Sequence, residues 1–365
     1  MKKLLILTPT ISSEEGRGRY AVDIISRLVR NFEIMVFSSE KSSLDEKNLL
    51  EQGVKIYNLP GENKLKGLTS LFSIFKLRKQ IKKHDIIHAL EGYPQAIIAV
   101  LASIGLNKKI IISGIGTYSV LPLDNPVKGV LLRWAYRKAY KILCISNFTK
   151  NQILKRIELN NLEVIKLGVD YNKFQQEITD NSSRKIILSV GALKPRKGYH
   201  VSIPAIAEVK KKYPDIKYYI VGGKPQKIYS DLVEKMDLGK NIEFLQGLSD
   251  EELINLYYKS DIFLLTPVTI NDNDFEGFGL VYLEAGACGK PVVGTYDCGA
   301  EDAIINNETG FLVPQNDIKK TTEAILKLLD NQELAQKMGE NGKKFAKKMD
   351  WSNVIKEYIK IYESI

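Results

Sequence analysis

Glu276 and Glu284 are two carboxylates in one glycine-rich stretch, residues 274–295, in the second half of the chain. Glycosidases use paired carboxylates at separations of roughly 5 to 9.5 Å. If both residues were helical, eight positions would place them about 12 Å apart along the helix axis. The spacing therefore favours contacts with the two ends of an extended ligand over an acid/base pair.

The segment between these glutamates has the features of an anion site. Gly277 and Gly279 allow backbone N–H groups to come close to a ligand, and an apolar run over 280–288 predicts a helix that begins there. The positive end of that helix points at the same place. A phosphate or a row of sugar hydroxyls could bind to this turn.

A second candidate site is the pair of cations Arg196 and Lys197. They stand between a strand expected over 186–190 and a helix expected over 199–213. Their charges and the start of the helix converge on one spot, which suits a diphosphate. A solvated basic turn is the alternative, and the glycines on both sides of the loop favour the binding role.

The second half repeats one arrangement, an apolar strand that ends in glycine. Gly191, Gly222, Gly247 and Gly277 each follow such a strand or stand in the loop after it. Strand ends of a parallel sheet meet at one edge, where nucleotides bind in α/β folds. We therefore expect these four glycines along one edge of a sheet.

The first half begins in the same way. A strand expected over 2–8 is followed by the polar loop 12–19 and by a helix expected over 20–29. Gly16 and Gly18 in that loop are a weak phosphate-loop pattern, and a flexible surface turn is an equal alternative.

Strand-like and helix-like pieces alternate along the whole chain, which is typical of an α/β fold with doubly wound parallel sheets. The length of 365 residues favours two domains of similar size. The expected strands of the first half cover 33–38, 54–59, 86–89, 109–113 and 141–146, and those of the second half include 217–221, 241–245, 261–265 and 292–294.

Composition excludes several classes of protein. Apolar residues make up 44% and charged residues 26%, which argues against disorder, and no run approaches the ~18 apolar residues of a membrane span. Three cysteines neither form a paired framework nor show metal-ligand spacing. We therefore expect no metal site and a cytoplasmic location.

The net charge of +10 is unevenly distributed. Residues 1–180 hold 28 Lys and Arg against 17 Asp and Glu, a balance of +11, whereas residues 181–365 hold 25 against 26. Within the first half, 64–83 and 127–157 carry seven and eight basic residues and no acid. Amphipathic basic helices of this kind could lie on an anionic membrane, and helices packed on the sheet with a solvated basic face are the alternative.

Taken together, these residues resemble the retaining GT-B glycosyltransferases of family 4. The matching segments are 189–191 with 196–198, 220–223, 276–280 with 284–285, 289–293, 309–313, and 167–170 in the first half. Glu276 and Glu284 stand in the E-x7-E spacing of that family. The resemblance implies two Rossmann-like domains that face a cleft: 1–180 for the acceptor and 181–350 for the donor, with a helix at 351–365 crossing back to the first.

The resemblance also implies roles for individual residues. Glu284 is expected to bind the ribose, and Arg196 and Lys197 the diphosphate. Glu276 and the backbone of residues 277–280 are expected to contact the donor sugar and phosphate. The loop with Gly16 and Gly18 is expected to close over the donor. The donor-binding positions in the turn are Gly277, Phe278, Gly279 and Leu280, together with the strand-end glycines Gly191, Gly222 and Gly247.

Two positions depart from the family pattern. Ile115 stands where many members have a histidine near the reacting centre, and Ala192 stands where many have an arginine. On the acceptor side we expect His88, Ile115, Thr117 and Tyr118. His88 ends an apolar strand, so a structural role is its alternative.

The expected activity is retaining transfer of a sugar from a UDP- or GDP-sugar, GDP-mannose included, to a glycan or lipid-linked hydroxyl in envelope synthesis. No cofactor is expected, because Arg196 and Lys197 supply the positive charge. Association with the cytoplasmic face of a membrane is the expected location of such a reaction. A protein with this fold that binds lipid, glycan or nucleic acid without catalysis is the alternative, and the isoleucine at 115 supports it.

Overall fold

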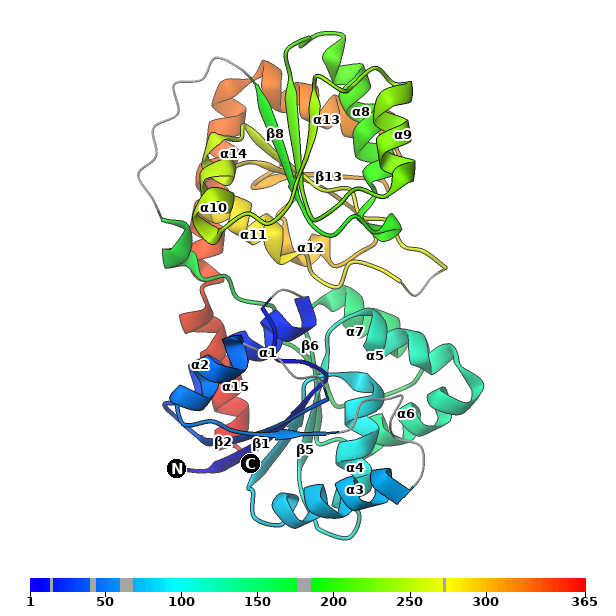
Figure 1. Cartoon of the computed structure of the whole chain (residues 1–365), viewed down its shortest axis with the longest axis vertical. Helices are drawn as coiled ribbons and strands as arrows, with labels where there is room; N and C mark the ends of the chain where they lie inside the picture. Colours follow the sequence, from blue (N-terminus) through cyan, green and yellow to red (C-terminus); the bar gives the residue numbers. More distant parts are fainter. Residues whose placement is uncertain (14–15, 40–43, 60–67, 176–184, 272–273) are drawn as a thin grey trace. The chain divides into compact units, whose positions relative to one another are not determined.

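The computed structural model describes residues 1–13, 16–39, 44–59, 68–175, 185–271 and 274–365, with the backbone alone for 68–73. It divides the chain into two compact units. The first consists of Met1–Lys166 and Val354–Ile365, and the second of Leu167–Asn353. In each unit a parallel sheet lies between helices (Figure 1).

The first unit contains a seven-stranded sheet in the order β3-β2-β1-β4-β5-β6-β7. All pairs in it are parallel, for example Leu4 opposite Ile34 and Ile86. The strands are β1 (Lys3–Thr8), β2 (Glu33–Ser38), β3 (Lys55–Asn58), β4 (Ile86–Ala89), β5 (Ile110–Gly114), β6 (Lys141–Cys144) and β7 (Leu162–Val164).

The second unit contains a six-stranded parallel sheet in the order β10-β9-β8-β11-β12-β13. Its strands are β8 (Ile186–Val190), β9 (Lys217–Val221), β10 (Ile242–Leu245), β11 (Ile262–Leu264), β12 (Val292–Thr295) and β13 (Gly310–Val313). The strand order reverses at β1/β4 in one sheet and at β8/β11 in the other, and α/β sheets bind ligands at such points. The expected doubly wound architecture is confirmed.

The helices cover both sheets. Those of the first unit are α1 (Gly16–Leu28), α2 (Leu44–Glu51), α3 (Leu68–Ile81), η2 (Gly92–Ala96), α4 (Ile97–Ser103), α5 (Thr117–Val120), η3 (Leu121–Asp124), α6 (Pro126–Lys138) and α7 (Asn147–Leu154). The rest are η4 (Tyr171–Phe174), η5 (Pro195–Lys197), α8 (Tyr199–Lys210), α9 (Lys227–Lys235), α10 (Asp250–Lys259), α11 (Leu280–Ala287), α12 (Ala300–Ala303), α13 (Ile318–Asp330), α14 (Gln332–Lys348) and α15 (Trp351–Glu363).

The central strands are buried on both faces, which explains their near-continuous apolar sequences. In β1, every residue after Lys3 is buried, and in β4 all four are. Helices therefore have to cover each face of the sheet. Within the described residues, no helix is both long and apolar enough to cross a bilayer.

The two units divide after residue 166, earlier than the boundary at 180 that the sequence predicts. The segment after this point is bonded within the second unit. Val169 N–H donates to the Met349 carbonyl (2.9 Å), and Tyr258 O–H donates to the Phe174 carbonyl (2.6 Å). Residues 176–184 lie outside the described ranges.

The end of the chain packs on the first unit. The hydroxyl of Tyr358 on α15 lies 3.1 Å from that of Tyr20 on α1, and the ring of Tyr362 makes an edge contact with Phe32. Lys2 Nζ donates to the Glu363 carbonyl at 3.0 Å. These contacts explain why residues 354–365 group with the first unit.

Two local predictions for the first unit need correction. Helix α1 begins at Gly16, so Gly16 and Gly18 lie in its first turn and not in a loop. A Cβ on Gly18 would lie 2.2 Å from the Ser12 carbonyl oxygen, so this glycine allows the helix to start against the preceding segment. Strand β7 is absent from the sequence-based prediction, because its three half-buried residues form no apolar run.

Candidate active site

Arg196 and Lys197 lie in η5, the short turn between β8 and α8. Gly198 follows with φ +73°, a left-handed conformation that glycine adopts readily. Thr266 Oγ1 donates to the Gly198 carbonyl at 2.9 Å, and a Cβ on Gly198 would lie 1.7 Å from the Thr266 carbonyl oxygen. The cationic turn is therefore held tightly against the chain that leaves β11.

Glu276 pairs with both cations. Its Oε2 accepts from Lys197 Nζ at 2.5 Å and from Arg196 Nη1 at 3.1 Å, while Asp274 lies 3.5 Å from Arg196 Nε. Burial by itself raises the pKa of Glu276, but the Lys197 and Arg196 cations outweigh it and lower that pKa to about 2. The Glu276 carboxylate is thus charged at neutral pH, and this buried side chain forms one cluster with the two half-buried cations.

The turn that carries Glu276 leads directly into α11. Gly279, with φ +84°, precedes the first helical residue, Leu280. The Gly299 N–H donates to the Glu276 carbonyl at 2.8 Å, which fixes the turn from the other side. Phe278 is 1% exposed, so its ring belongs to the core and only its backbone is suited to a ligand contact.

The structure brings two of the other strand-end glycines together. A Cβ on Gly222 would lie 1.8 Å from the Gly191 carbonyl oxygen, which also accepts from Tyr199 O–H at 2.7 Å. Gly247 follows β10, with open space where a side chain would be. Gly191 and Gly222 thus shape the strand ends beside the cationic turn, and Gly247 lies after the outer strand β10.

Glu284 is buried in the second turn of α11, with 1% of its surface exposed. Its Oε2 accepts from the Tyr257 hydroxyl of α10 at 2.9 Å. The carboxylate thus packs against a neighbouring helix in this structure. A ribose contact by Glu284 remains a prediction, and it requires the side chain to become accessible.

In the first unit, Arg17 forms a cluster that the sequence analysis missed. Its Nη1 lies 3.4 Å from Oε2 of the buried Glu91, and its guanidinium lies 4.2 Å from the centre of the Tyr118 ring. These residues follow β1, β4 and β5, which are neighbours in the sheet. Glu91 stands two residues after β4, so an acid just beyond an apolar strand is the signal that could have revealed it.

Ile115, Thr117 and Tyr118 lie together after β5. Ile115 and Thr117 are half-buried, whereas Tyr118 is 46% exposed on α5. The Ile115 N–H donates to Ser119 Oγ at 3.1 Å, so the turn is fixed by its own residues. These three side chains are accessible at a sheet edge, as a contact with an acceptor requires.

His88 is not accessible in this structure, and its predicted contact with an acceptor requires the side chain to become accessible. The side chain is fully buried in β4. Its Nδ1 lies 2.6 Å from Tyr362 Oη, and its Nε2 lies 2.8 Å from Ser113 Oγ, which in turn lies 2.7 Å from Tyr20 Oη. His88 thus joins α15 to the sheet, and this is the structural role that was the alternative to a contact with the acceptor.

We expect His88 to make stability depend on pH. Burial lowers its pKa from 6.5 to about 3, so between these values the unfolded chain binds a proton that the folded chain excludes. The stabilisation is complete above pH 6.5 and is lost as the pH falls, by about 1.4 kcal/mol per unit. Urea unfolding at pH 7, 6 and 5 measures this slope.

His88→Gln should flatten that slope, and the exposed His200→Gln should leave it unchanged. Burial also lowers the pKa of His84, but His84 titrates in both variants. Equal slopes in the two variants would contradict the assignment.

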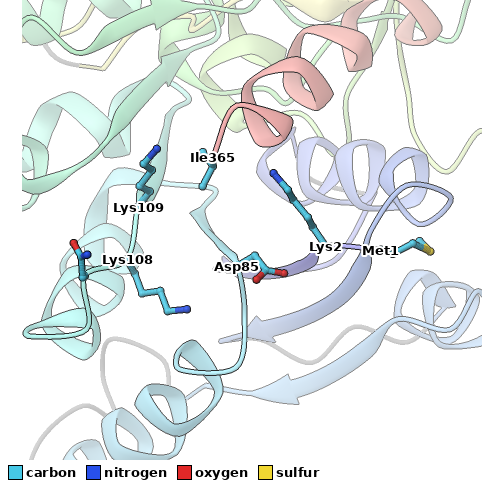
Figure 2. Close-up of a pocket in the computed structure, with 7 residues that line it drawn as sticks. Met1, Lys2, Asp85, Lys108, Lys109 and Ile365 are labelled. Carbon is cyan, nitrogen blue, oxygen red and sulfur yellow. The ribbon is translucent and has the colours of Figure 1, made fainter.

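A pocket of about 600 Å³ lies at the edge of the first sheet where the strands begin, opposite the edge that carries Ile115 and Tyr118 (Figure 2). Lys2, Lys108 and Lys109 surround it, with Asp85 and Ile365. Lys108 Nζ donates to the His84 carbonyl at 2.6 Å, and Lys109 Nζ lies 4.6 Å from the centre of the Tyr140 ring. These cations hold the protein's own chain, and the pocket is remote from the strand ends at which α/β sheets bind nucleotides.

The described residues contain no group of three His, Cys, Asp or Glu side chains arranged to hold a metal ion. The three cysteines are buried, and burial raises the pKa of each thiol to about 12. They are inert packing residues at neutral pH.

The chain is similar to known proteins in both sequence and fold. Residues 15–173 match the family model described as Glycosyltransferase Family 4, and residues 170–345 match the model described as Glycosyl transferases group 1. An uncharacterized glycosyltransferase from Methanocaldococcus jannaschii is 31% identical over 340 residues, which are 92% of this chain and 90% of that protein.

A second relative is named GDP-mannose-dependent alpha-(1-6)-phosphatidylinositol monomannoside mannosyltransferase, from Mycolicibacterium smegmatis. It is 28% identical over 91% of this chain and 90% of its own length. Among solved structures, Anabaena HepE in complex with UDP and glucose matches with a TM-score of 0.83 over the full length of both chains, at 18% identity. That similarity shows a shared fold.

Proposed function

Because the chain belongs to the group 1 glycosyltransferases with the GT-B fold, we propose that it moves a sugar from a nucleoside diphosphate to a hydroxyl of a glycan or lipid-linked acceptor. The observation that carries this proposal is the ion-paired cluster of Arg196, Lys197 and the buried Glu276 at the carboxyl ends of the second sheet. Two cations beside a helix start match the charge of a diphosphate.

The reaction we propose keeps the anomeric configuration. The bond between the anomeric carbon and the phosphate oxygen breaks, and a bond from the same face to the acceptor oxygen forms. The acceptor's proton passes to the leaving phosphate oxygen, which explains how transfer proceeds without a separate base. Negative charge develops on the leaving group, and Arg196 and Lys197 stabilise it from fixed positions.

Glu276 has two roles in this scheme. Before the donor binds, its carboxylate balances the charge of the two cations and keeps them in place. When the donor is bound, we propose that Glu276 contacts the sugar while the cations engage the diphosphate. We propose that no metal ion is needed, because the two side chains supply the positive charge that the leaving group requires.

We propose a lipid-linked acceptor in envelope synthesis at a cytoplasmic membrane surface. The name of the Mycolicibacterium smegmatis relative gives GDP-mannose as its donor and a phosphatidylinositol mannoside as its acceptor. The excess positive charge in the first half of this chain suits an anionic lipid or membrane surface. The proposal includes donors with uracil and donors with guanine.

Thermal unfolding with UDP, GDP, UDP-glucose and GDP-mannose tests the proposal. A ligand that binds only the folded chain stabilises it, by about 2.7 kcal/mol at 100 times its Kd. We expect the ligands with one of the two bases, uracil or guanine, to raise the unfolding temperature. The substitution Arg196→Ala should reduce that rise. Lys194→Ala is the control, because Lys194 is an exposed cation in the same loop. The absence of a shift with every nucleotide would contradict the proposal.

The second candidate is a binding protein without catalysis, favoured by the isoleucine at position 115. Ile115 offers no titratable group at the edge where the acceptor is expected. Such a protein would bind a glycan or lipid but release no nucleoside diphosphate from any donor. If the ligand were a nucleic acid, the measured affinity would fall steeply as the salt concentration rises.

A further inference from the structure

Large apolar side chains on the described surface are concentrated on one part of the first unit. Of fourteen that are exposed, six lie on or next to α3, α4 and α6, whereas the described part of the second unit has three. We call these six the apolar face: Phe75, Leu101, Ile104, Val127, Val130 and Leu131. A cluster of exposed apolar residues on a soluble protein marks an interaction site.

The three helices are neighbours on the same side of the first sheet (Figure 1). Arg78 on α3 donates from Nη1 to the carbonyls of Ala102 (3.1 Å) and Ile104 (2.6 Å), which ties α3 to the end of α4. Helix α4 packs in turn against α6. The apolar face therefore belongs to one structural layer.

Helix α6 contributes three of the six residues of this face. Val127 is 70% exposed, Val130 64% and Leu131 43%. Their spacing of three and four residues places them on one side of the helix, away from the buried Leu132 and Tyr136. The helix thus has aliphatic side chains on its outer side as well as on its inner side. A helix whose outer side contacts only water would carry polar residues there.

The charge around this face has one dominant sign. Residues 76–157 contain 15 Lys and Arg and three acids. Of the three, Glu91 is buried and Asp124 accepts from Arg156 at 2.8 Å. The same helices carry exposed cations, namely Lys76 and Lys79 on α3, Lys82 and Lys83 directly after it, and Arg137 and Lys138 at the end of α6.

We propose that the apolar face docks on the surface of an anionic lipid bilayer. Aliphatic side chains would enter the boundary between headgroups and acyl chains, while the lysines and arginines contact the headgroups. A second copy of the chain fits less well, because two surfaces of the same positive charge would face each other. The inference rests on the membrane location in the proposed function and assigns it a surface, but it does not depend on the identity of the donor or the acceptor.

Vesicle flotation with the full chain tests it, without any sugar donor. We expect binding to vesicles of phosphatidylcholine with phosphatidylglycerol, weak binding to phosphatidylcholine alone, and weaker binding as salt increases. Val130→Asp with Leu131→Asp should reduce the affinity by about tenfold or more. Arg137→Gln with Lys138→Gln should also reduce it, through the loss of charge.

Ile228→Asp is the matched control, because Ile228 is a similarly exposed residue (65%) on α9 of the second unit. Its binding should equal that of the unchanged chain, and circular dichroism should show that every variant is folded. Equal binding by Val130→Asp/Leu131→Asp and Ile228→Asp, or no binding by the unchanged chain, would overturn the proposal. So would a dimer in sedimentation velocity that the α6 substitutions convert to monomer, since a second copy would then cover the face.

Discussion

Replacing Lys197 by alanine is expected to lower kcat/KM for sugar transfer by about 10²- to 10³-fold. The Lys197 side chain is 12% exposed and its Nζ lies 2.5 Å from Glu276 Oε2, so the charge acts from a position where water screens little of it. Removing one such preorganised charge from a developing anion costs about this factor. Initial rates of nucleoside diphosphate release, at fixed acceptor, measure the loss.

Lys194→Ala controls for a general change in the loop, because Lys194 is exposed two residues before Arg196. It should retain nearly full activity. Because Lys197→Ala leaves Glu276 buried with a single cation, the assay has to be run below the unfolding temperature of the variant. Equal activity of the Lys197 and Lys194 variants would show that the cluster is structural and not part of the reaction.

Gly198→Ala is expected to destabilise the second unit by about 3 kcal/mol or more. The new methyl group would meet the Thr266 carbonyl oxygen at 1.7 Å, and the left-handed backbone costs further energy for any residue with a Cβ. To relieve the clash, η5 has to move away from the end of β11. Urea unfolding at an unchanged m-value measures the loss of stability.

Gly239→Ala is the matched control, because no atom lies within 4 Å of the position that its Cβ would take. That variant should be close to neutral or slightly stabilised. If both substitutions lower the free energy of unfolding by the same amount, the contact between Gly198 and Thr266 does not hold the cationic turn.

Burial of the strands made most of the fold predictable. Residues 33–38, 86–89, 186–190 and 217–221 are strands with the expected bounds, because strands inside a parallel sheet need apolar residues on both faces. β7 lacks this pattern and was missed. The start of α1 was misplaced because Gly16 and Gly18 are poor helix formers, and here packing outweighs that preference.

For the site, the sequence by itself determined the family and the position of one charged cluster at the strand ends. Arg196, Lys197 and Glu276 belong to two short loops at strand ends, and the parallel order of the sheet brings such loops to the same edge. The local sequence was sufficient to place both loops at this edge, because each loop follows a segment with the apolar pattern of a strand.

Only the tertiary structure decided which side chains are buried and what they contact. His88 bonds to Tyr362, 274 positions away, and Glu284 turns toward Tyr257 of another helix. Val130 on α6 is 64% exposed, whereas Leu132 two residues later is fully buried. A side chain's exposure depends on elements that pack against it from distant parts of the chain, and a pattern of neighbouring residues does not contain that information.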